Sequence, residues 1–82
     1  MVTLVDLIVV GKLIKTIFFS YNNDKDQGYI EYDMEKRKVV SYSYSQRDKE
    51  SKIKYSFSKA IRAIEKLIEY NKFPEKYRYI WY

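Results

Sequence analysis

Two residue types that carry much of enzyme chemistry are missing from this 82-residue sequence, which contains no cysteine and no histidine. Without cysteine there are no disulfides, thiolate metal sites or thiol nucleophiles. Without histidine the commonest general base and zinc ligand are also missing. No pairing of a nucleophile with a base can be identified among the remaining residue types. We therefore expect a protein that is not an enzyme and that uses no metal and no cofactor.

Glycine and proline are scarce as well, with two glycines and one proline. A flexible linker or a disordered tail needs more of these residues, so nearly every segment should be ordered. A chain of this length is too short for a second hydrophobic core, and 46% of its residues are hydrophobic. We predict a single domain that spans residues 1–82.

The sequence also lacks a long hydrophobic run. Its most apolar stretch, residues 4–19, is interrupted by Asp6, Lys12 and Lys15 and falls short of the roughly 20 apolar residues that a spanning helix needs. The basic start and the small-residue cleavage site of a signal peptide are missing too. We expect no membrane association and a cytoplasmic location.

The first 21 residues are rich in Val, Leu, Ile and Phe and predict β-structure. Residues 1–10 favour a strand, although Thr3 and Asp6 also fit a short capped helix. Gly11 marks a turn, or a bulge if one strand continues through it. Residues 13–21 predict another strand, and both of its faces are partly apolar: Lys15, Ile17, Phe19 and Tyr21 alternate with Ile14, Thr16, Phe18 and Ser20.

A polar run at residues 22–27, closed by Gly28, predicts the loop of a hairpin. Its oxygen-bearing residues alternate as they do in calcium loops. However, Gln27 replaces the required glycine, and Asp33 replaces the bidentate glutamate. We therefore expect no metal here.

Residues 29–34 and 38–45 alternate between polar and apolar side chains, which is typical of paired strands with one buried face. If Tyr32 lies opposite Val40, and Ile30 opposite Tyr42, the apolar side chains of both strands share one face. Residues 35–37 then form the turn.

The region 46–54 is highly charged and predicts a solvated loop. After it, apolar residues recur every three or four positions, which predicts an amphipathic helix from about Ser56 to Tyr70. We expect Ser56 or Ser58 to cap this helix, Asn71 to end it and Pro74 to prevent its continuation. Residues 77–82 are aromatic and β-prone and predict a last strand at the sheet edge.

These elements predict an α+β fold, a small two-layer domain in which an antiparallel β-sheet of three to five strands packs against one amphipathic α-helix. The order is roughly (β)βββαβ, with the apolar faces of sheet and helix buried against each other. The predicted core consists of Ile17, Phe19, Ile30, Tyr32, Val40, Tyr42, Ile61, Ile64, Leu67 and Ile68.

Charge is unevenly distributed along the chain, whose net charge is +5. Residues 1–34 carry 3 basic and 5 acidic side chains, whereas residues 35–82 carry 13 basic and 6 acidic ones. If the hairpin turn, the charged loop and the helix start share one side, they form a basic patch for phosphates or an acidic protein surface. A solvated face is the simpler interpretation. The candidate patch consists of Lys36, Arg37, Lys38, Arg47, Lys49, Lys52, Lys54, Lys59 and Arg62.

Tyrosine is the other excess, with 10 residues. Aromatic rings among basic residues can stack on unpaired bases, but half-buried strand positions and protein interfaces also favour tyrosine. The C-terminal segment carries more aromatic surface than one edge strand easily buries, so it is a candidate interface, with packing onto the core as the alternative. Its residues are Phe73, Tyr77, Tyr79, Trp81 and Tyr82.

From these features we predict a small non-enzymatic binding module that acts through contacts with a protein partner or with a second copy of itself. Its size and composition suit an accessory or inhibitor protein of a phage or other mobile element. The alternative is a nucleic-acid-binding protein that uses the basic patch and the strand tyrosines.

Overall fold

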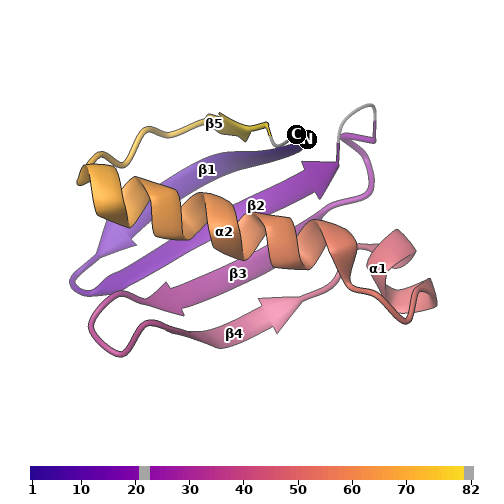
Figure 1. The fold of residues 1–82 in the computed structure, drawn as a ribbon, viewed down its shortest axis with the longest axis horizontal. Helices are drawn as coiled ribbons and strands as arrows, with labels where there is room; N and C mark the ends of the chain where they lie inside the picture. Colours follow the sequence, from indigo (N-terminus) through magenta and orange to yellow (C-terminus); the bar gives the residue numbers. More distant parts are fainter. Residues whose placement is uncertain (21–22, 81–82) are drawn as a thin grey trace.

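The computed structural model describes residues 1–20 and 23–80, which form one antiparallel sheet and two helices (Figure 1). The sheet order is β4-β3-β2-β1-β5. This confirms the predicted α+β fold, with five strands against one main helix. In chain order the elements are β1 (Val2–Val10), β2 (Leu13–Ser20), β3 (Gly28–Asp33), β4 (Lys38–Ser43), α1 (Gln46–Glu50), α2 (Tyr55–Tyr70) and β5 (Tyr77–Tyr79).

The N-terminal segment is a strand, and it turns at Gly11, whose φ is +60°. The β1–β2 register shifts between Val5 and Ile8, where Asp6 adopts a φ of 52°. The hydroxyl of the buried Thr16 donates to the Val5 carbonyl oxygen at 3.0 Å. This bulge lets Leu7 point into the core although the strand continues to Val10.

Helix α2 crosses one face of the sheet (Figure 1). An α-helix is about 10 Å wide, whereas five strands spaced about 4.8 Å apart span about 19 Å, so one helix cannot cover them all. Its backbone runs closest to β1, β2 and β5. Strand β4 therefore lies at an uncovered margin, where five of its six residues are exposed.

The core lies between α2 and the sheet. Four of the predicted core residues, Ile30, Tyr32, Ile64 and Leu67, are buried there, while Ile61 and Ile68 pack on it half-buried. The complete set of buried apolar residues is Val2, Leu4, Leu7, Ile14, Phe18, Ile30, Tyr32, Ala60, Ala63, Ile64 and Leu67.

The prediction for β2 chose the wrong face. Ile14, Thr16 and Phe18 point at α2, whereas the predicted Ile17 and Phe19 lie half-buried on the opposite side of the sheet. Both faces of β2 are partly apolar in the sequence, and the face that is buried carries the hydroxyl groups of Thr16 and Ser20. The structure satisfies the Thr16 hydroxyl with backbone carbonyl oxygens, which removes most of the cost of burying it.

The prediction for β4 was also wrong in part. Ile30 does lie opposite Tyr42, but Tyr32 lies opposite Val39, because β4 contains one extra residue at this point. Val40 and Tyr42 are 48% and 54% exposed, so neither belongs to the core. Their strand lies beyond the width of α2.

The predicted end of the helix is confirmed, because Asn71 adopts a left-handed conformation with a φ of 54°. Strand β5 pairs with β1 at the sheet edge, as expected, but spans only residues 77–79. Residues 81 and 82 lie outside the described part of the chain. Within that part, neither helix has the length and hydrophobicity needed to cross a membrane.

Tyr32 provides a test of the core. Its hydroxyl oxygen is buried without a hydrogen-bond partner among the described residues, which costs about 1–3 kcal/mol. We expect Tyr32→Phe to raise the free energy of unfolding in urea by about 1 kcal/mol. The exposed Tyr70→Phe serves as the control and should change nothing. A loss of stability in Tyr32→Phe would contradict this interpretation.

The same variant has a pH signature. Burial, together with the nearby Glu65 carboxylate, raises the pKa of the Tyr32 hydroxyl. The folded state therefore holds this proton more tightly than the unfolded state, whose tyrosines ionise near pH 10. The wild-type protein loses stability as the pH rises through this raised pKa. The difference in free energy of unfolding between Tyr32→Phe and the wild type, measured in urea, should therefore increase above about pH 10.

Candidate functional site

The charged region 46–54 is a folded segment and not the solvated loop that the sequence predicted. The Asp26 carboxylate accepts hydrogen bonds from the backbone N–H groups of Gln46 at 2.6 Å and Arg47 at 3.0 Å. The Ser45 hydroxyl accepts another from the Asp48 N–H. Together they satisfy amide groups at the start of α1, which a helix cannot pair internally.

Helix α1 in turn caps α2. Asp48 is only 2% exposed, and its carboxylate accepts hydrogen bonds from the backbone N–H groups of Ser56 at 3.3 Å and Phe57 at 2.9 Å. The capping residue of α2 itself is Lys54, whose side chain makes no cap bond. The predicted Ser56 and Ser58 caps were therefore wrong. A residue of the preceding helix supplies the acceptor that the local sequence lacks.

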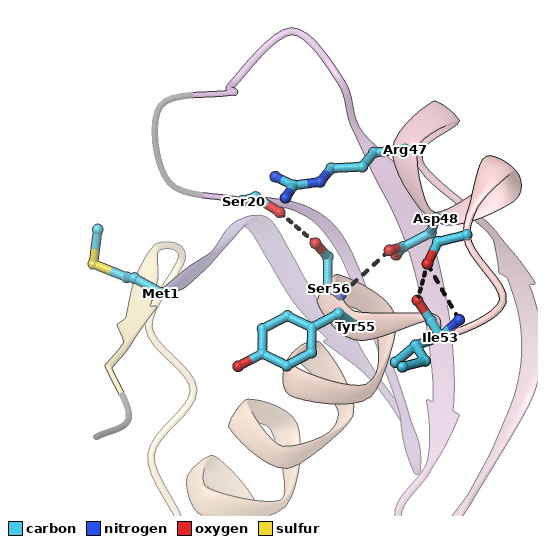
Figure 2. Close-up of a pocket in the computed structure, with 8 residues that line it drawn as sticks. Met1, Ser20, Arg47, Asp48, Ile53, Tyr55 and Ser56 are labelled. Carbon is cyan, nitrogen blue, oxygen red and sulfur yellow. Dashed lines mark hydrogen bonds between the residues drawn. The ribbon is translucent and has the colours of Figure 1, made fainter.

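A pocket of about 350 Å³ opens between α1, the start of α2 and the end of β2 (Figure 2). The hydroxyl groups of Ser20 and Ser56 bond to each other, and within the described residues no carboxylate or amine bonds to either hydroxyl. Neither serine therefore has the base that activates a nucleophile. The pocket is lined by Met1, Ser20, Arg47, Asp48, Ser51, Ile53, Tyr55 and Ser56.

This pocket is not a ready anion site either. The free N–H groups of a helix start attract anions, but here Asp48 already occupies the Ser56 and Phe57 amides. The Ser51 hydroxyl is also engaged, because it bonds to the backbone of Ile53. Ser20, Asp48, Ser51 and Ser56 of the pocket wall are thus all engaged in hydrogen bonds within the protein.

The structure divides the predicted basic patch. The β3–β4 turn with Lys36 and Arg37, and Lys38 at the start of β4, lie at the opposite end of β4 from α1 (Figure 1). A six-residue strand separates the two by about 20 Å. Arg47, Lys49 and Lys52 are exposed at the α1 end. The nine residues therefore form no single surface.

The other three predicted patch residues lie on or next to α2. Lys54 has a structural role, since its ammonium group donates to the backbone carbonyl oxygens of Asp48 at 2.7 Å and Ser51 at 2.6 Å. Lys59 is half-buried, with its ammonium group 5.6 Å from the centre of the Tyr55 ring. Arg62 is exposed on the helix.

The C-terminal aromatic residues are shared between core and surface. Phe73, Tyr77 and Tyr79 are half-buried and pack against the core. The remaining two, Trp81 and Tyr82, lie outside the described residues. The three described aromatic residues of this segment thus contribute to the core, and only part of their surface is exposed for contacts with a partner.

A second aromatic cluster lies at the other edge of the sheet. The ring of Tyr42 lies 4.9 Å from that of Tyr44 and 5.2 Å from that of Phe57, measured between centroids. The Lys54 ammonium group lies 5.1 Å from the centre of the Tyr44 ring. These residues join β4, the segment after it and the first turn of α2, and Tyr42 remains more than half exposed. We call Tyr42, Tyr44 and Phe57 the β4 aromatic cluster.

Sequence reasoning missed both Asp48 and the β4 aromatic cluster. A single carboxylate in a lysine-rich segment has the pattern of a solvated residue, and nothing local indicates its burial. The alternation of tyrosine and serine in residues 41–45 did predict a strand with one ring-bearing face. It could not indicate that α2 touches this face only through Phe57 and leaves Tyr42 more than half exposed.

The described residues contain no group of three or more acidic side chains arranged to hold a metal ion. No known protein family model matches the chain, and neither a curated protein nor a solved structure was found to match it. The surfaces of the molecule itself are therefore the basis for any proposal about function.

Replacing Asp48 tests the link between the two helices. Asp48→Ala leaves two amides of α2 without an acceptor, so we expect the free energy of unfolding to fall by about 2 kcal/mol. The matched control is Glu50→Ala, an exposed carboxylate of the same short helix, which should change stability little. Urea denaturation followed by circular dichroism measures both. Equal losses in the two variants would contradict a special role for Asp48.

Proposed function

We propose that this protein is a binding module without enzymatic activity that captures an extended segment of a partner protein along the outer edge of β4. The observation that carries the proposal is the β4 aromatic cluster beside an edge strand. Among the described strands, none pairs with the outer side of β4. An extended peptide can add to such an edge through backbone hydrogen bonds, while exposed rings provide contacts to its side chains.

The charge around this edge supports an acidic partner. Residues 36–54 carry seven basic side chains and two acidic ones, Asp48 and Glu50. Asp48 is buried and satisfied by backbone amides. Exposed cations thus lie at both ends of β4, three at its start in residues 36–38 and three around α1. Complementary charge favours the encounter with an acidic segment and its orientation.

The same edge is protected against indiscriminate pairing. The extra residue Val40 interrupts the ladder, and Lys38 places a charge at the start of the strand. Bulges and lysines are two devices by which natural sheets avoid edge-to-edge aggregation. An acidic segment neutralises the charge of Lys38, and a side chain that packs on the aromatic cluster compensates for the backbone hydrogen bonds lost at the bulge. The edge therefore selects such segments.

A random peptide library tests this proposal. We expect peptides selected on the immobilised protein to combine β-prone apolar or aromatic residues with aspartate or glutamate. Tyr42→Ala should weaken the binding of a selected peptide by about tenfold or more, as the loss of an aromatic hot spot does. Fluorescence polarisation with the labelled peptide measures the affinity.

Tyr70→Ala is the matched control, because Tyr70 is exposed to a similar degree but lies at the far end of α2. It should leave the affinity unchanged. Equal effects of the two substitutions, or selected peptides without acidic residues, would count against capture at this edge.

The second candidate function is nucleic-acid binding at the α1 end. Arg47, Lys49 and Lys52 are exposed there, and the exposed ring of Tyr55 lines the neighbouring pocket. Cations with an aromatic ring suit a single strand with unpaired bases. This candidate does not need the basic residues of the distant turn.

A salt titration separates the two candidates. If three cations contact phosphates, the logarithm of the affinity for polyuridylate should fall with the logarithm of the salt concentration with a slope of about −2. Lys49→Glu should make this slope shallower, whereas Lys72→Glu, after α2, should not. No binding at low salt would exclude the second candidate. The cytoplasmic location and an origin in a phage or other mobile element also stay predictions.

A further inference from the structure

Neither the core nor the β4 edge explains the face of the sheet opposite α2. In the described residues α2 packs on the other face, and α1 contacts α2. The strand registers arrange the side chains of this face in rows across β1, β2, β3 and β4. One row is Val5, Ile17, Tyr29 and Ser43, and the next is Ile8, Lys15, Glu31 and Ser41.

The centre of this open face is apolar. Val5, Ile17 and Tyr29 are half-buried by their neighbours, and Ile8 is exposed. An antiparallel sheet with one solvated face normally has polar residues there. The apolar side chains on β1 and β2 thus indicate a surface that another layer covers.

We propose that the open face binds a second copy of this chain, with the two sheets packed face to face about a two-fold axis that runs along the strands between β2 and β3. In such an arrangement β2 lies over the partner's β3, and β1 lies over the partner's β4. A patch that binds its own copy must be self-complementary about this axis.

In the row Val5, Ile17, Tyr29 and Ser43, the sizes of the side chains are self-complementary about the axis. The axis places Ile17 against the partner's Tyr29, so that two large half-buried side chains meet near the centre. Val5 lies over the partner's Ser43. A large side chain opposite a small one lets two layers interdigitate.

In the row Ile8, Lys15, Glu31 and Ser41, the charges are self-complementary about the axis. Lys15 and Glu31 are cross-strand neighbours, but they form no ion pair within the described chain. The axis places Lys15 of each copy against the partner's Glu31, and Ile8 over the partner's Ser41. A partner with charge of one sign would leave one of these two groups without a counter-charge.

The available area suits a reversible dimer. The eight residues of β2 extend about 26 Å, and the four overlapping strands, each about 4.8 Å wide, cover about 19 Å, which gives roughly 500 Å² on each copy. The total of about 1,000 Å² is the lower limit for a specific interface. We expect self-association in the micromolar range. The outer edge of β4 stays free, so this inference is independent of the proposed peptide capture.

Charge reversal tests the dimer. Lys15→Glu alone and Glu31→Lys alone each create two like-charge contacts across the axis, so each should weaken self-association by about tenfold or more. In an equimolar mixture of the two variants every such contact is again between opposite charges. The mixture should therefore form a heterodimer with the wild-type affinity. Sedimentation velocity over micromolar to millimolar concentrations measures all three samples.

Lys72→Glu and Glu69→Lys are the matched controls, since both residues are exposed at the end of α2, which packs on the other face. Their self-association should equal that of the wild type. Circular dichroism establishes that each variant is folded.

A second measurement uses the unaltered chain. A carbodiimide joins an amine to a carboxylate in contact with it, so a mixture of ¹⁵N-labelled and unlabelled protein should yield Lys15–Glu31 cross-links between differently labelled copies. A wild-type monomer at all concentrations would overturn the proposal. So would the absence of these mixed cross-links, or a variant mixture that associates no better than its components.

Discussion

One helix has to cover a sheet of five strands, and the features of this molecule follow from that mismatch. The helix is about half as wide as the sheet. It buries the side chains of the central strands and leaves β4 at an open margin, and within residues 1–20 and 23–80 no second layer covers the opposite face. Both surfaces proposed for binding are thus parts of a small two-layer fold that its main helix leaves open, although Phe57 of its first turn contacts the Tyr42 ring at the β4 edge.

The position of the helix depends on two carboxylates. Asp26 caps α1, and Asp48 in α1 caps α2. This sequence of caps connects the loop before β3 to the start of the main helix. It also keeps Arg47 and Lys49 beside the end of β4, and it brings Phe57 to the Tyr42 ring. A segment with few apolar side chains is ordered here by hydrogen bonds to backbone amides.

Predictions from the sequence succeeded where one pattern was dominant. The three- and four-residue spacing of apolar side chains predicted α2 to within one residue, and the alternation in residues 29–34 predicted β3 and its buried Ile30 and Tyr32. They failed where both faces of a strand were apolar. In β2 the choice between Ile17 and Ile14 depends on whether hydroxyl groups can be satisfied inside the protein, which only the neighbouring strand and helix decide.

By itself, the sequence determined that the chain has no thiol or imidazole chemistry, and its periodicity determined the main helix and the two strands of the hairpin before it. These properties depend on residue types and on local backbone preferences. The tertiary structure alone decided which face of β2 is buried, that the basic residues form no single patch and that Asp48 caps the helix. It also decided that the aromatic surface of β4 is free. Each of these depends on residues distant in sequence, whose approach is set by the register of the sheet and the width of the helix.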